Sequence, residues 1–133
     1  MGYRVGIIGA GLIGNKRAKA LRPEDRLVAV ADLSLEKAQS LAKTHQAQVE
    51  SSWENLIERA DIDVVIVATS NNAIPLCAAR ALKNKKAILI EKPGGRNPQE
   101  LKGLLELEKE TQQVARVGFN HRFHPALLKA KNM

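Results

Sequence analysis

Short apolar runs alternate with helical patterns along the whole chain, and this alternation constrains the fold more than any other feature. Six runs predict strands, at residues 4–8, 27–31, 47–50, 63–68, 87–90 and 114–119. Between and after them, helical spacing of apolar residues predicts helices at 12–21, 35–43, 51–59, 73–82, 98–110 and 126–131. For the helix at 51–59, Ser51 and Glu54 predict a capping box. The uninterrupted apolar strands predict an α/β fold, a doubly wound parallel sheet with strand order 3-2-1-4-5-6.

A glycine-rich turn, GAGLIG, follows the first predicted strand and opens the first helix. Gly9 permits a tight turn, Gly11 lets the backbone approach a pyrophosphate, and Gly14 lets the helix lie close to the strand. The N–H groups at the helix start, including those of Leu12 and Ile13, can donate to phosphate oxygens. We therefore expect these residues to bind a dinucleotide in a Rossmann domain. The alternative is a glycine turn that binds nothing.

Asp32 ends the second predicted strand, 18 residues after Gly14. A carboxylate at this interval can accept hydrogen bonds from both ribose hydroxyls of the adenosine half, and it repels a 2′-phosphate. No arginine follows it closely, so the sequence favours NAD over NADP as cofactor. The alternative role for Asp32 is to cap the next helix.

Further polar residues follow the fourth and fifth predicted strands. Thr69 and Asn71 are expected to face the middle of the cofactor, although Thr and Asn also cap helices often. Lys92 is expected at the same rim of the sheet, where a lysine can hold a ribose hydroxyl and a substrate hydroxyl and assist proton transfer. A solvated surface lysine is the alternative.

Composition narrows the partners and the compartment. The net charge of +7 is spread along the chain and aromatic residues make up only 3%, which disfavours nucleic acid as a partner. No apolar run is long enough for a membrane helix, so no membrane partner is expected. The single cysteine, Cys77, favours a reducing cytoplasm. His121 and His124 have no further ligand cluster, so no metal site is predicted.

Taken together, these motifs resemble the Gfo/Idh/MocA family of NAD(P)-dependent oxidoreductases. The resemblance rests on the glycine turn, on Ala-Thr-Ser-Asn at 68–71, on Glu-Lys-Pro at 91–93 and on Asn-His-Arg-Phe-His-Pro at 120–125. It implies hydride transfer between a nicotinamide and a hydroxyl-bearing carbon of a sugar, polyol or sugar nucleotide. It further implies that Lys92 is catalytic and contacts substrate and nicotinamide ribose, and that Arg122 lies near the nicotinamide end. Ser70 and Glu91 join the expected cofactor site through the same motifs.

Two departures from the family pattern matter. The family often has Pro where this chain has Ser70, and His where it has Ile74. Members also continue into a second domain, which contacts the substrate. We therefore predict a dinucleotide-binding Rossmann domain at 1–123 and, at 124–133, the start of a helix leading to a substrate domain absent from this chain. A sugar-type small molecule is the expected substrate, and the expected protein partner is a second copy or a chain that supplies the missing domain. A non-catalytic NAD-binding sensor or partner module is the alternative function.

Overall fold

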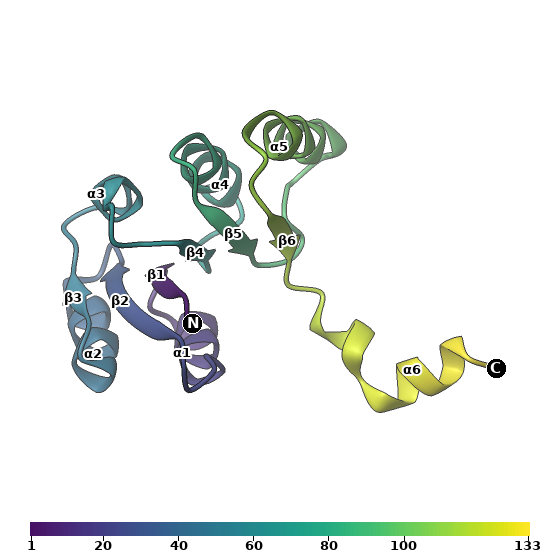
Figure 1. Cartoon of the computed structure of the whole chain (residues 1–133), viewed down its shortest axis with the longest axis horizontal. Coiled ribbons are helices and arrows are strands. Elements are labelled where there is room, and N and C mark those ends of the chain that lie inside the picture. Colours follow the sequence, from purple (N-terminus) through teal and green to yellow (C-terminus); the bar gives the residue numbers. More distant parts are fainter.

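One six-stranded parallel sheet organises the molecule. The computed structural model describes residues 1–133, and its strands lie in the order β3-β2-β1-β4-β5-β6 (Figure 1). The strands are β1 (Arg4–Ile8), β2 (Arg26–Ala31), β3 (Gln48–Val49), β4 (Val64–Val67), β5 (Ala87–Ile90) and β6 (Ala115–Val117). The doubly wound fold and its strand order are confirmed.

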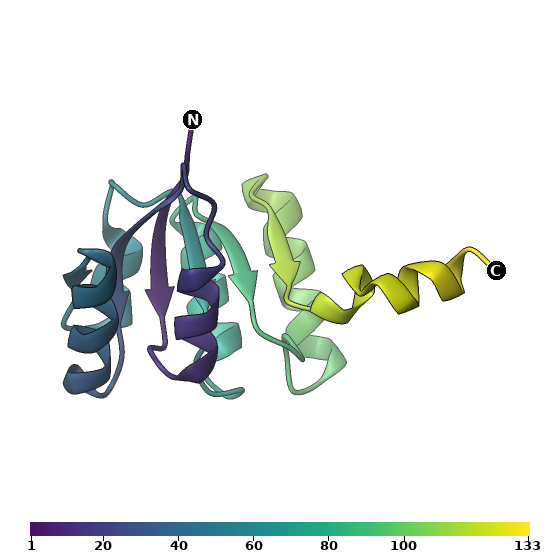
Figure 2. The same ribbon diagram turned by 90° about the horizontal axis from the view of Figure 1, so that it is seen from below.

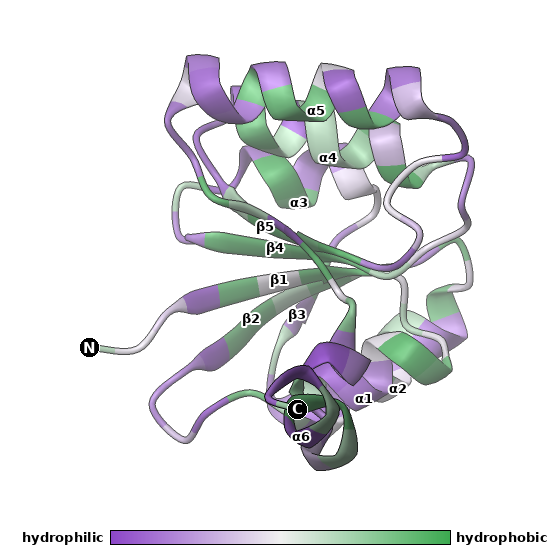
Figure 3. Ribbon diagram, turned by 90° about the vertical axis from the view of Figure 1, so that its right-hand side faces the viewer, coloured by the Kyte–Doolittle hydropathy of each residue, from purple (hydrophilic) through white to green (hydrophobic).

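Helices cover both faces of this sheet. They are α1 (Leu12–Lys19), α2 (Leu35–His45), α3 (Trp53–Glu58), α4 (Ile74–Lys83), α5 (Pro98–Thr111) and α6 (Pro125–Lys131), with a 3₁₀ turn η1 (Asn120–Phe123) before the last. Helices α3, α4 and α5 lie on one face, and α1 and α2 lie on the other (Figure 3).

The apolar character of the strands follows from these two layers. Successive side chains of a strand point to opposite faces. In β4, Val65 and Val67 belong to the core beneath α3, α4 and α5, whereas Ile66 belongs to the core beneath α1 and α2. A strand covered on both faces therefore needs an apolar residue at every position.

Several element boundaries differ from the predictions by one or more residues, and two of these differences have a clear physical cause. The predicted capping box of Ser51 and Glu54 is wrong: Ser52 caps α3, and its hydroxyl accepts a hydrogen bond from the Asn55 N–H. The sixth strand ends at Val117 rather than at residue 119. Its end is early because the Phe119 N–H donates to the Val117 carbonyl at 2.8 Å, which curls the chain into η1.

Helix α6 projects away from the sheet (Figures 1 and 2). All residues from 120 to 133 are exposed. The ring nitrogen Nδ1 of His124 accepts a hydrogen bond from the Ala126 N–H and so caps the helix. The division of the chain at residue 123 stays a prediction. None of the helices combines the length and apolar character that crossing a bilayer requires.

Candidate functional site

A hollow of about 460 Å³ opens at the carboxyl ends of β1, β2 and β4. Its walls come from the turns after these strands, from the segment before α3 with the first turn of that helix, and from α4. The lining residues are Ile8, Gly9, Ala31, Asp32, Leu33, Ser51, Ser52, Trp53, Glu54, Thr69, Ser70, Ala73 and Cys77. The strands all point toward this edge of the molecule (Figure 2). Because β2 and β4 flank β1 on opposite sides, the hollow lies where the winding of the sheet reverses, which is the usual ligand position in such sheets.

The three glycines of the turn between β1 and α1 have different physical roles. Gly9 has φ +102°, a conformation that L side chains rarely adopt, and a Cβ there would overlap the Ala68 carbonyl. A Cβ at Gly14 would overlap the carbonyl oxygen of Gly9, so both glycines are needed for the fold itself. A Cβ at Gly11 would meet nothing within 4 Å. Gly11 therefore borders open space, two residues along the chain from Gly9, which lines the hollow.

The N-terminus of α1 is left free by the protein's own side chains. No side chain caps it, and its first turn holds no acidic residue. Instead, the side-chain amide of Asn15 donates to the carbonyls of Ala10 and Gly11, at 3.0 and 2.9 Å, and so holds the turn from the carbonyl side. The free N–H groups and the helix dipole give this point the properties of an anion site. Leu12 and Ile13 lie exposed at this turn of the helix.

Asp32 connects the glycine turn to the turn after β2. Its Oδ2 accepts from the Ala10 N–H and its Oδ1 from the Ser34 N–H, both at 2.7 Å. The capping alternative for Asp32 is wrong, because the hydroxyl of Ser34 is the cap of α2 and accepts from the Lys37 N–H. A carboxylate oxygen has more than one acceptor position, so Asp32 can serve these two N–H groups and still accept from a ligand.

The residues after β4 differ in whether they line the hollow. Thr69 and Ser70 line the hollow, whereas Asn71 is exposed and does not. Neither Thr69 nor Asn71 caps α4, whose N-cap is Ala73 and carries no side-chain hydrogen bond. The helix-capping alternative for these two side chains is therefore wrong.

Lys92 and Glu91 follow β5, outside the hollow. Lys92 is exposed at the sheet edge where the other site residues gather. Glu91 is half-buried, and its carboxylate pairs with the guanidinium of Arg17 on α1, with 2.5 Å between Nε and Oε1. The structure thus ties the Lys92 turn to the helix that follows the glycine turn.

Arg122 is turned back on its own segment. Its guanidinium donates to the carbonyls of Val117 and Phe119, both at 3.1 Å. It also lies over the rings of Phe119 and Phe123, at 5.9 and 5.6 Å from their centres. In this conformation Arg122 stabilises η1 and does not line the hollow.

Sequence reasoning missed the wall made by Ser51 and Ser52 before α3 and by Trp53 and Glu54 in its first turn, and it missed Cys77 on α4. Burial, with Glu54 adding a smaller effect, raises the pKa of the Cys77 thiol to about 11. The thiol is therefore neutral near pH 7 and acts as an apolar wall. The predicted strand order contained the missing signal, because the third strand lies beside the second and must end at the same edge.

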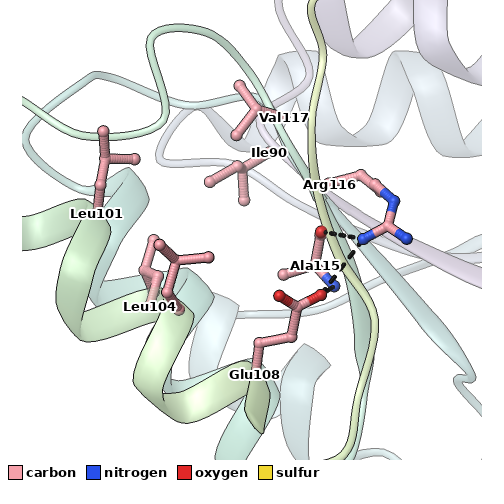
Figure 4. A pocket seen from close by; sticks show the side chains of 8 residues that line it. Ile90, Leu101, Leu104, Glu108, Ala115, Arg116 and Val117 are labelled. Atoms are coloured by element: carbon pink, nitrogen blue, oxygen red, sulfur yellow. Dashed lines mark hydrogen bonds and ion pairs between the residues drawn. The ribbon is translucent and has the colours of Figure 1, made fainter.

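A second hollow, of about 200 Å³, lies between α5 and β6 and holds none of the predicted residues (Figure 4). It is mostly apolar, with Leu101 and Leu104 facing Val117. At one end, the carboxylate of Glu108 accepts from the Ala115 N–H at 2.9 Å and so satisfies an N–H group of the edge strand. Glu108 therefore stabilises the edge strand β6.

The parallel sheet, the glycine turn and the hollow beside Asp32 define a dinucleotide-binding α/β domain. The model of the oxidoreductase family with an NAD-binding Rossmann fold, Gfo/Idh/MocA, matches residues 3–119. The chain belongs to this family, as the motifs predicted, and its Rossmann fold is of the NAD-binding type.

Individual relatives agree with this assignment. Inositol 2-dehydrogenase of Rhizobium meliloti is 34% identical to the chain over 127 residues. This match covers 94% of the chain and 38% of the relative. The crystal structure of Lactobacillus casei myo-inositol dehydrogenase, in complex with NAD(H) and myo-inositol, is 27% identical with a TM-score of 0.92, covering 99% of this chain and 41% of that one. UDP-N-acetylglucosamine 3-dehydrogenase of Acidithiobacillus ferrooxidans is 26% identical with a TM-score of 0.90, covering 99% and 43%. The chain spans between 36 and 41% of the length of the curated relatives it matches.

Proposed function

We propose that this chain is the cofactor-binding part of an NAD-dependent oxidoreductase. The reaction moves a hydride between a nicotinamide and a hydroxyl-bearing carbon of a sugar, polyol or sugar nucleotide. The observation that carries the proposal is the hollow at the sheet reversal, which has Asp32 on one wall and the open space at Gly11 beside it. The names of the relatives, inositol 2-dehydrogenase and UDP-N-acetylglucosamine 3-dehydrogenase, support this substrate class.

The residues fit the adenosine and pyrophosphate parts of NAD. The uncapped start of α1 offers N–H donors to the pyrophosphate, with Leu12 and Ile13 at that helix turn and room left by Gly11. The free acceptor positions of Asp32 suit ribose hydroxyls, and its charge opposes a 2′-phosphate. Thr69, Ser70 and Asn71 follow β4 and are assigned to the middle of the cofactor, and Thr69 and Ser70 are on the wall of the hollow.

At the nicotinamide end, bound NAD supplies hydride transfer at C4 of its ring. We assign Lys92 to the substrate hydroxyl, where its ammonium orients the oxygen and exchanges a proton with it. Glu91 and Arg122 are assigned to the same end. Arg122 reaches a cofactor only if its guanidinium leaves the carbonyls of Val117 and Phe119.

Since the chain spans 36–41% of its relatives' length, we propose that further substrate contacts come from structure beyond these residues. That structure is a second domain, a separate chain or another copy of this one. In this proposal residues 1–123 form the cofactor unit and α6 leads toward the added structure.

A fluorescence titration tests the cofactor proposal. Trp53 is the single tryptophan and lines the hollow, so bound NADH should quench its emission by energy transfer. We expect saturable binding of NADH with weaker binding of NADPH, and a Trp53→Phe variant should keep the NADH emission change while losing the transfer signal. Binding of neither cofactor would refute the proposal, and equal binding of both would refute the role of Asp32.

A further inference from the structure

One arginine joins three separate segments near the Lys92 turn. Arg17 lies in the second half of α1, and its Nε pairs with Glu91 Oε1 at the end of β5, at 2.5 Å. Its Nη2 donates to the Asn120 side-chain carbonyl in η1 at 3.0 Å. The side chains of Arg17 and Glu91 are only 18 and 14% exposed, so the pair is weakly screened by water.

The space for this pair is provided by Gly118. A Cβ at residue 118 would overlap Arg17 Nη2 and would lie 3.3 Å from Glu91 Oε1. The φ angle of Gly118 is not in the left-handed region, so the backbone itself does not require glycine here. The absence of a side chain at this position is explained by the room that the guanidinium takes up.

Glu91 also closes the turn that carries Lys92. Its N–H donates to the Val67 carbonyl of β4, and its carbonyl accepts from the Gly94 N–H, both at 3.0 Å. These two hydrogen bonds hold the backbone before and after Lys92, and Arg17 holds the Glu91 side chain. The N-terminus of α1, about one and a half turns from Arg17, lies near the hollow, which the preceding Gly9 lines.

We propose that Arg17 is a positioning residue, which sets the Lys92 ammonium relative to the cofactor held at the start of α1. The inference rests on the proposed function, in which α1 and Lys92 contact the same cofactor. The Arg17 guanidinium is already engaged, through Nε by Glu91 and through Nη2 by Asn120, so in this proposal it acts through Glu91 and not by contact with the cofactor. An ion pair that only stabilises the fold is the competing explanation.

Protection of Lys92 from acetylation separates the two explanations. The chain is treated with acetic anhydride with and without NADH, and labelling of Lys92 is followed by peptide mass spectrometry. With NADH at about ten times its Kd, only one molecule in about eleven is free, so a covered Lys92 should react about tenfold more slowly. In Arg17→Gln, we expect this slowing to fall below about twofold, with the Kd for NADH unchanged within about twofold because Arg17 makes no contact with the cofactor.

Two further variants make the test specific. Gly118→Ala keeps the arginine but displaces the end of its side chain, and it should reproduce the loss of protection. Arg80→Gln breaks a more exposed pair between α4 and α3, Arg80 to Glu58 at 2.6 Å, and should leave protection at the wild-type level. Arg17→Lys, which keeps the charge, should restore part of it.

The outcomes divide cleanly. Full protection in both Arg17→Gln and Gly118→Ala would overturn the positioning role while leaving the proposed function intact. A large loss of NADH affinity in Arg17→Gln would also overturn it, because the residue would then support the cofactor site as a whole. Wild-type chain that binds no NADH would remove the proposed function, and this inference with it.

Discussion

Replacing Asp32 should damage the fold as well as the cofactor preference, because both of its oxygens already hold backbone N–H groups. The Ala10 N–H belongs to a buried residue in the glycine turn, and the Ser34 N–H belongs to the turn before α2. In Asp32→Ala, the first of these donors loses its partner in a place that water reaches poorly. The two turns that shape the hollow also lose their connection.

The size of the effect follows from these two contacts. A hydrogen bond to a charged group contributes about 1.5–3 kcal/mol, and water can replace part of the loss at the half-exposed Ser34. We therefore expect Asp32→Ala to lower the free energy of unfolding by about 2–4 kcal/mol. For a chain of this length that corresponds to a fall in Tm of roughly 8–16 °C. NADH and NADPH should both bind more weakly, and their ratio should move toward NADPH.

Thermal unfolding by circular dichroism, with cofactor titrations at a temperature where the variant stays folded, measures both effects. Asp63→Ala is the matched control, because Asp63 also accepts from a backbone N–H, that of Arg4, at the opposite edge of the sheet. It should lower Tm without changing the NADH to NADPH ratio. Leu33→Arg is the converse variant: Leu33 lines the hollow and is fully exposed, so an arginine there should improve NADPH binding about tenfold with Tm unchanged. An Asp32→Ala variant with wild-type Tm would refute the anchoring argument, and an unchanged cofactor ratio would refute the ribose assignment.

Four further substitutions, at the glycine turn, at Asp63 and at Lys92, have distinct expected results. Gly11→Val should lower the free energy of unfolding by no more than about 1 kcal/mol and should abolish NADH binding. Gly14→Ala should lower it by about 1–3 kcal/mol in an unfolding titration, because the new Cβ overlaps a backbone carbonyl. Equal losses of stability in the two variants would contradict this. The hydrogen bonds from Arg4 hold the pKa of Asp63 below its usual 3.8, so the unfolded chain binds more protons and Tm should fall as the pH drops below that value. Asp63→Asn should flatten that fall, and an unchanged pH profile would contradict the pairing. Lys92→Ala, in an assembly that turns over substrate, should reduce kcat by about 10²–10⁴-fold with the Kd for NADH retained, while an unaffected rate would favour the non-catalytic sensor.

The sequence predicted the sheet because its central strands are continuous apolar runs, VVIV in β4 and AILI in β5, as expected for a parallel sheet covered on both faces. Element ends were less predictable, and α3 illustrates why. Ser51 and Ser52 are adjacent, and either can accept from an N–H three residues later, so local chemistry does not choose between them. The choice depends on where the chain leaves β3, which tertiary contacts decide.

The site was predictable where a local motif carried it and not where distant segments meet. The glycine turn and Asp32 were predicted from spacing, and Thr69 from the strand order; the same strand order also placed the wall at Trp53, which the prediction did not use. The contact of Arg17 with Glu91 spans 74 positions. No periodicity or motif connects residues so far apart, and only the folded structure brings them together.

Most residues that form or hold the glycine turn serve both the fold and the ligand, so their identity alone does not distinguish the two roles. Gly9 and Gly14 would be required by the backbone even if nothing bound here, and Asp32 would still be needed by Ala10 and Ser34. Gly11 is different, because its own Cβ would meet no protein atom and its φ of −78° suits any residue. As the N-cap of α1, this position has only a weak folding preference for glycine, whereas a pyrophosphate lying against the backbone leaves no room for a side chain. Of the fingerprint residues, Gly11 is therefore the one whose identity argues for a bound dinucleotide independently of the fold.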